Sequence, residues 1–110
     1  MKSRNRKENK HFYNCPIEAS LDIIGNKWKG VILYHLMKGT KRFNELRRLI
    51  PTVSQRVLTV QLRELEDDKV ITRKIYPEIP PKVEYSLTDL GKKLKAILAS
   101  LEVWGREVMG

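Results

Sequence analysis

Five polar residues lie within ten positions of one another and have side chains that suit contact with nucleic acid: Ser54, Gln55, Arg56, Thr59 and Arg63. Glutamine can pair with adenine and arginine with guanine, each through two hydrogen bonds. Thr59 suits a thymine methyl group or a phosphate, and Ser54 suits a phosphate at the N-terminus of a helix. Arg63 lies further along and is expected to contact the DNA backbone. The alternative interpretation is that these side chains are only the solvated face of an amphipathic helix.

One predicted helix, from Ser54 to about Asp67, would carry all five residues. Ser54 is a natural N-cap, because its side chain can accept a hydrogen bond from a backbone N–H that the helix leaves free. The side opposite Arg56 and Arg63 is apolar and is expected to be buried: Leu58, Leu62 and Leu65. A recognition helix reads bases mainly with residues near its N-terminus, which here are Gln55 and Arg56.

The elements around that helix have the order of a winged helix-turn-helix. A shorter helix over 43–50 precedes it and ends at Pro51, with four apolar residues predicted to face inward: Phe43, Leu46, Leu49 and Ile50. Two β-type segments follow, 70–76 and 83–87, joined by a proline-rich connection. The link 41–43 is extended and could add a small third strand. We therefore predict an α+β fold, mainly α, in which one helix enters the DNA major groove.

The charge of the chain agrees with this prediction. It has 22 basic and 13 acidic residues among 110, a net charge of +9. Such an excess attracts DNA, RNA or an anionic membrane surface, although it also simply improves solubility. Residues 1–12 are mostly basic and lack apolar periodicity, so we expect a flexible basic arm there and one folded domain over 13–110. The arm could follow a DNA backbone or serve only as a solubilising tail.

Several classes of protein are disfavoured by what the sequence lacks. No apolar run approaches the roughly 20 residues of a membrane span, and no apolar segment follows the charged N-terminus, so we expect a cytoplasmic protein. A single cysteine, Cys15, can form neither an internal disulfide nor a four-cysteine zinc site. His11 and His35 stand alone, and neither a phosphate-binding glycine loop nor a serine elbow is present. We expect no enzymatic activity, no metal and no cofactor.

Three more helices are predicted outside the DNA-reading segment. Pro16 suits the first position of a helix, and Ile17, Leu21 and Ile24 recur on one of its faces. Gly25-Asn26 ends it, and a second helix runs from about 27 to 37. The last helix follows Thr88, a plausible cap, and carries apolar residues at close to seven-residue spacing.

The ordered part of the chain resembles the HxlR-type branch of the winged-helix transcription regulators, which are similar in shape to the MarR regulators. The resemblance is carried by segments in a specific order: Cys15-Pro16-Ile17-Glu18, Ile24-Gly25-Asn26-Lys27-Trp28, Arg42-Phe43-Asn44-Glu45-Leu46, 54–59, Leu62-Arg63-Glu64-Leu65-Glu66, 80–88 and Gly91. It implies a homodimer that binds double-stranded DNA at a palindromic operator and regulates transcription. We expect this regulator to be a repressor. The resemblance also implies that the β-ribbon contacts the flanking minor groove or phosphates. Three basic residues on or beside the ribbon are candidates for that contact, with Arg73 and Lys74 expected near its tip: Arg73, Lys74 and Lys82.

The same resemblance implies that helices from both chain ends build the dimer interface. Two recognition helices about one DNA turn apart, roughly 34 Å, would provide the specificity that a single domain lacks. The last helix has more apolar surface than a domain of this size needs, and Trp104 is hard to bury so near the C-terminus. The residues predicted to meet the partner subunit are Ile17, Leu21, Leu94, Ile97, Leu101, Trp104 and Val108. The alternative is that this stripe packs only within its own domain.

Cys15 is a candidate sensor. It precedes Pro16 at a helix start and follows a basic arm, and both features favour the reactive thiolate. Some regulators that this chain resembles use a cysteine at that position to sense quinones, aldehydes or hypochlorite, so an electrophile or oxidant is a possible signal. The alternative is an unreactive residue that packs against the core. Two other functions stay open for the whole chain: a winged-helix protein-interaction module and a non-specific architectural DNA binder.

Overall fold

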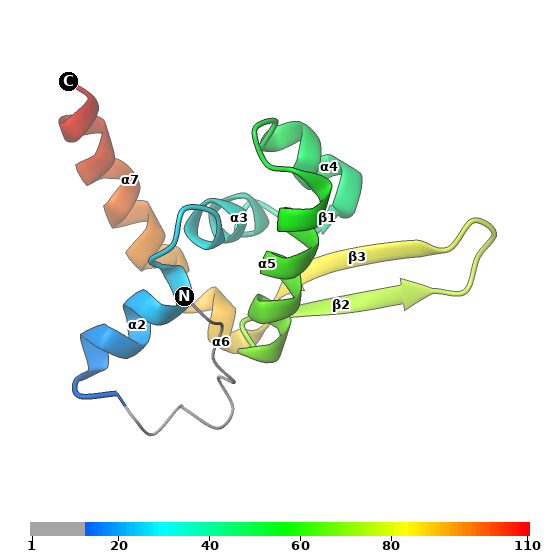
Figure 1. Ribbon diagram of the computed structural model, residues 1–110, viewed down its shortest axis with the longest axis horizontal. Helices are drawn as coiled ribbons and strands as arrows, with labels where there is room; N and C mark the ends of the chain where they lie inside the picture. Colours follow the sequence, from blue (N-terminus) through cyan, green and yellow to red (C-terminus); the bar gives the residue numbers. More distant parts are fainter. Residues whose placement is uncertain (1–12) are drawn as a thin grey trace.

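The computed structural model describes residues 13–110, so the predicted arm over 1–12 lies outside the described residues. The helices are α2 (Pro16–Ile24), α3 (Lys29–Leu36), α4 (Phe43–Leu49), α5 (Gln55–Asp67), α6 (Asp89–Lys92) and α7 (Lys95–Met109), and the strands are β1 (Lys41–Arg42), β2 (Ile71–Tyr76) and β3 (Lys82–Leu87). The β2–β3 ribbon projects away from the helices, and α7 extends on the opposite side (Figure 1). The predicted winged helix-turn-helix is confirmed.

The strands form one antiparallel sheet in the order β1-β3-β2. Residues of β2 and β3 pair from Ile71 opposite Leu87 to Tyr76 opposite Lys82. The short β1 pairs with the other edge of β3, with Lys41 opposite Tyr85. The extended link before α4 is therefore a third strand, and it attaches the helix-turn-helix directly to the wing.

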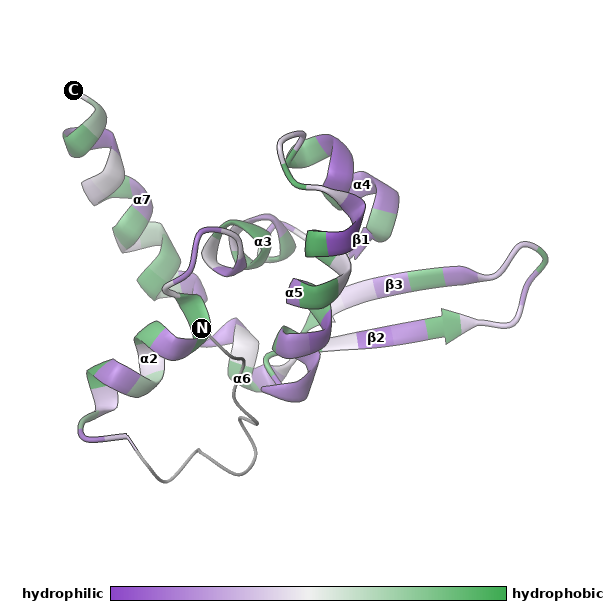
Figure 2. Ribbon diagram, in the orientation of Figure 1, coloured by the Kyte–Doolittle hydropathy of each residue, from purple (hydrophilic) through white to green (hydrophobic). Residues whose placement is uncertain are grey.

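The core lies between α3, α4, α5 and the base of the sheet. Leu58, Leu62 and Leu65 are buried, as the apolar stripe of α5 predicted, and they pack with residues from every neighbouring element, among them Ile32, Leu33, Leu36, Leu46, Ile50, Val53, Val70, Ile71 and Leu98. Side-chain burial of this kind is the main stabilising contribution to such a domain. Apolar residues also continue along α7 and occur at the far end of the ribbon, away from this core (Figure 2). No helix within residues 13–110 is long and apolar enough to cross a membrane.

The two helix caps predicted from the sequence are present in the structure. The Ser54 side chain accepts a hydrogen bond from the Val57 backbone N–H at 3.1 Å. The Thr88 side chain accepts one from the Gly91 N–H at 3.0 Å. Both predicted caps are confirmed, because each depends only on residues within one helical turn.

Three predicted features differ in the structure. The second helix begins at Lys29 rather than near 27, because the Asn26 side chain accepts hydrogen bonds from the Trp28 and Lys29 N–H groups and starts the helix there. Leu49 was predicted to face inward but is 44% exposed, since Ile50 and Val53, from the following turn, fill the core at the end of α4. The last helix is divided into α6 and α7 by a turn at 93–94.

Candidate nucleic-acid interface

The outer face of α5 carries the residues predicted to read DNA. Gln55, Arg56 and Arg63 are exposed, whereas Thr59 is half-buried. The Thr59 hydroxyl donates to the Gln55 carbonyl at 2.8 Å, so its methyl group is the part best able to meet a base. The Ser54 oxygen accepts the capping bond, and its proton remains able to donate to a phosphate. All five predicted residues thus belong to one helix start and one outer face.

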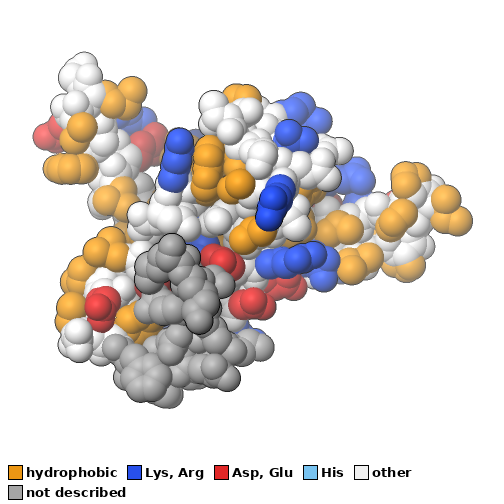
Figure 3. Space-filling view, viewed as in Figure 1, with side chains coloured by type: hydrophobic (Ala, Val, Ile, Leu, Met, Phe, Trp, Pro, Cys, Tyr) orange, Lys and Arg blue, Asp and Glu red, His pale blue; other side chains and the backbone are white. Residues whose placement is uncertain are grey.

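Arg56 and Arg63 are two helical turns apart, about 10.5 Å along the axis. Neither makes an ion pair or side-chain hydrogen bond with any residue in 13–110. Lys and Arg side chains stand out over α4 and α5 in the space-filling view (Figure 3). Two guanidinium groups on one helix face are available for bases or phosphates, because no contact within residues 13–110 has to break first.

The wing places its basic residues differently from the prediction. Arg73 and Lys74 lie in the middle of β2, opposite Tyr85 and Glu84, and the tip is formed by residues 77–81. The expectation that they lie near the tip is wrong, because β2 continues to Tyr76. The Arg73 Nε atom lies 3.8 Å from a carboxylate oxygen of Glu66 on α5, so this side chain points back to the recognition helix.

Lys74 and Lys82 share the other face of the ribbon. The Lys74 Nζ atom lies 4.9 Å and the Lys82 Nζ atom 4.5 Å from the centroid of the Tyr76 ring. Lys74 is two residues before Tyr76 on β2, and Lys82 is opposite Tyr76 on β3. Lys82 also lies 3.8 Å from Glu84. These contacts are weak, as is the Arg73–Glu66 pair at the same 3.8 Å, so all three basic side chains remain able to move to a phosphate.

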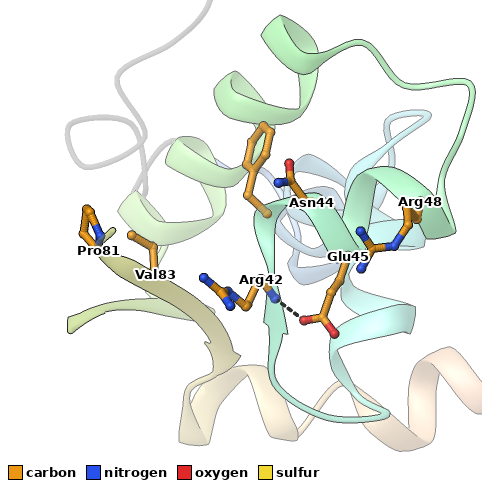
Figure 4. A pocket seen from close by; sticks show the side chains of 7 residues that line it. Arg42, Asn44, Glu45, Arg48, Pro81 and Val83 are labelled. Atoms are coloured by element: carbon orange, nitrogen blue, oxygen red, sulfur yellow. Dashed lines mark hydrogen bonds between the residues drawn. The ribbon is translucent and has the colours of Figure 1, made fainter. Parts of the chain in front are cut away.

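A hollow of about 410 Å³ separates the start of α4 from the wing. It is lined by Arg42, Phe43, Asn44, Glu45, Arg48, Pro81 and Val83 (Figure 4). The Glu45 carboxylate accepts a hydrogen bond from the Arg42 backbone N–H at 2.7 Å, and the Arg42 side chain lies on the side of the hollow nearer Val83 (Figure 4). Neither Arg42 nor Arg48 forms an ion pair within residues 13–110. Arg42 and Arg48 are two further candidate phosphate contacts. Sequence reasoning missed Arg42, because only the sheet brings it next to the wing.

Two polar contacts attach α5 to the start of α3 and to the turn just before it, and neither was predicted. Lys29 is completely buried, and its Nζ atom donates to Glu64 at 2.5 Å. Asn26 donates through Nδ2 to Gln61 at 2.9 Å. The pairs are 35 residues apart in sequence, so no local pattern indicated them.

The apolar residues predicted for a dimer interface remain largely uncovered within one chain. Six are exposed, namely Ile17, Leu21, Ile97, Leu101, Trp104 and Val108, and Leu94 is half-buried against the core. Between α2 and the α6–α7 segment lies an apolar hollow of about 550 Å³, lined in part by Ile17, Leu94 and Ile97. An exposed apolar surface of this extent is typical of a protein-interaction site.

Cys15 is exposed at the N-cap of α2. Its thiol is accessible to a reagent in solution, which argues against the interpretation that it packs in the core. Within residues 13–110 no group of His, Cys, Asp and Glu could hold a metal ion.

The helix-turn-helix, the wing and the basic outer face define a winged-helix DNA-binding regulator. The chain belongs to the HxlR-like helix-turn-helix family, which matches residues 23–110. It is 56% identical over 96 residues to the HTH-type transcriptional regulator YdeP of Bacillus subtilis strain 168, covering 87% of this chain and 75% of YdeP. These relationships make it a helix-turn-helix transcriptional regulator.

Solved structures of regulators share the fold. The redox regulator HypR in its oxidized form has 53% sequence identity and a TM-score of 0.81, over 84% of this chain and 96% of HypR. The reduced form of the transcriptional regulator YodB from B. subtilis has 39% identity and a TM-score of 0.74, over 84% of this chain and 91% of YodB. YodB also has diamide-treated and quinone-bound structures.

Proposed function

We propose that this regulator binds a palindromic operator as a homodimer and represses transcription by occupying it. The observation that carries the proposal is the start of α5, where Gln55 and Arg56 are exposed while the opposite face of the same helix is anchored in the core. A helix held in this way can enter the major groove and present both side chains to base edges.

The homodimer is supported by the apolar residues of α2 and α7. One domain offers only one recognition helix and one wing, which is a modest contact area. Pairing the exposed faces around Leu21, Leu101 and Trp104 would bury that apolar surface and would relate two copies of α5 by a twofold axis. A twofold protein reads a palindrome, with half-sites about one DNA turn, roughly 34 Å, apart.

Residues 13–110 are the unit that performs this binding, and the basic segment 1–12 adds phosphate contacts. Ser54, Arg63, Lys74 and Lys82 hold the backbone, together with Arg42 and Arg48. A dimer that occupies promoter DNA would exclude the transcription machinery, and the proposed place of action is the cytoplasm.

Cys15 is the proposed sensor of an electrophile or oxidant. Support comes from its exposure and from the relatives, since HypR is a redox regulator and YodB has been solved with quinone bound. With a quinone, the thiolate sulfur adds to a ring carbon: a C–S bond forms, the ring C=C π bond breaks, and its electron pair moves to a quinone oxygen, which takes up a proton from water. The added group at the start of α2 would disturb the dimer face and change the spacing of the two recognition helices.

The test is a binding titration at fixed salt with the DNA upstream of the gene and a scrambled duplex. Preference for the upstream DNA is expected. Equal affinity for both would indicate an architectural binder, and absence of salt-sensitive binding would indicate a protein-interaction module. A quinone arm is run with wild type and Cys15→Ser: release of wild type alone is expected, whereas equal responses would remove Cys15 from the mechanism.

A further inference from the structure

Lys29 is a charged side chain in a position that an apolar residue would fill without a desolvation penalty. Its side chain is 0% exposed, and its Nζ atom lies 2.5 Å from Glu64, whose side chain is 28% exposed. Moving an ammonium group out of water costs several kcal/mol, which a partner offsets only when the geometry is good. This part-buried ion pair is therefore weak evidence for stability, but its geometry fixes one point of α5 relative to the start of α3.

A second contact repeats the first about one helical turn away. Asn26 and Lys29 are three residues apart, and so are their partners Gln61 and Glu64 on α5. The Asn26 amide donates to Gln61 at 2.9 Å, while its oxygen accepts from the Trp28 and Lys29 N–H groups at 3.0 and 2.8 Å. The amide that attaches to α5 is thus held by the start of α3.

The two polar contacts fix the axial position and the rotation of α5, which apolar packing alone leaves adjustable. The leucine stripe of α5 is buried, but the hydrophobic effect is non-directional and tolerates small sliding and rotation. Two hydrogen bonds separated by about 4.5 Å along the helix set both its axial position and its rotation. Rotation matters on the outer face, because a base contact by Arg56 needs donor and acceptor within about 2.7–3.2 Å.

We propose that Asn26 and Lys29 are positioning residues, which through Gln61 and Glu64 hold α5 in the orientation that reads the operator. This inference rests on the proposed sequence-specific DNA binding. The pair Asn26–Gln61 and Lys29–Glu64 is called the α3–α5 clamp below. The clamp determines discrimination between DNA sequences, while non-specific attraction to phosphate is independent of it.

The experiment compares stability with discrimination in the double variant Lys29→Met/Glu64→Met. It removes one positive and one negative charge, so the net charge is unchanged, and it leaves neither partner buried alone. Thermal unfolding gives the midpoint, and titrations at fixed salt give Kd for upstream and scrambled DNA. The expected result is a midpoint close to wild type, unchanged Kd for scrambled DNA, and a ratio of the two Kd values reduced about tenfold, the size of one lost base contact.

The matched control is Asp89→Asn/Lys92→Gln, which removes an opposite pair of exposed charges on α6 and should change neither quantity. A double variant that keeps the wild-type ratio would overturn the inference. If wild type itself shows no preference, the proposed function fails instead, so the two failures are distinguishable. Should the double variant not fold, Gln61→Met decides, because it removes only the exposed contact to Asn26. A reduced ratio supports the clamp, and an unchanged ratio overturns it.

Discussion

Replacing Arg56 with alanine should weaken operator binding without weakening the fold. Arg56 is exposed in the first turn of α5 and makes no ion pair with any residue in 13–110. Nothing internal is lost on its removal, so the free energy of unfolding should change by less than about 0.5 kcal/mol. A bidentate contact to guanine contributes about 1–3 kcal/mol, which is about 5- to 150-fold in Kd.

Arg63→Ala is the matched control, because it removes the same charge from the same outer face two turns further along. If Arg63 contacts phosphate, its loss should weaken upstream and scrambled DNA by the same factor. It should also reduce the slope of log K against log salt by about 0.9, the value for one released counterion. Arg56→Ala should differ by weakening upstream DNA far more than scrambled DNA.

The assay is fluorescence anisotropy with both duplexes over a series of salt concentrations, alongside chemical denaturation of each variant. If Arg56→Ala weakens both duplexes by one factor and lowers the salt slope as Arg63→Ala does, Arg56 contacts phosphate and the base-reading assignment is refuted. A loss of stability in Arg56→Ala would refute the argument that its side chain has no internal partner.

Three further predictions concern the dimer, the packing and pH. Trp104 is 65% exposed in the proposed dimer face, and Trp104→Asp places a charge there. Sedimentation should show that the dimer is converted to a monomer, and operator binding should weaken. An unchanged sedimentation coefficient would contradict the interface. Gly91→Ala should destabilise by about 1–3 kcal/mol in denaturation, because its Cβ would lie 2.0 Å from a backbone carbonyl, whereas Gly105→Ala, with nothing within 4 Å, should not destabilise. Burial and two nearby lysines lower the pKa of His35 from 6.5, so the unfolded chain takes up a proton at higher pH than the folded one. The free energy of unfolding should therefore fall as pH drops below about 6.5 towards the lower pKa of His35 in the folded state. If a His35→Gln variant loses the same free energy of unfolding between pH 7 and 5, His35 is not the cause.

Local features of the fold could be read from the sequence because they depend on neighbours along the chain. Ser54 and Thr88 cap their helices as predicted, since a cap needs only a side-chain oxygen and N–H groups within one turn. The buried stripe of α5 followed from helical periodicity, and the order of helices and strands indicated the wing. The outer residues Gln55, Arg56 and Arg63 followed from the same periodicity.

Features that join distant segments were decided only by tertiary structure. Leu49 is exposed because residues after α4 fill the space it was expected to occupy. The hollow beside Arg42 exists because β1 pairs with β3. Lysine is usually a surface residue, and Lys29 is buried against Glu64 only because α3 and α5 pack together. Helical period and caps are set by bonds within a few residues. The Lys29–Glu64 ion pair instead depends on the distance in space between residues 35 positions apart in sequence, which no local pattern encodes.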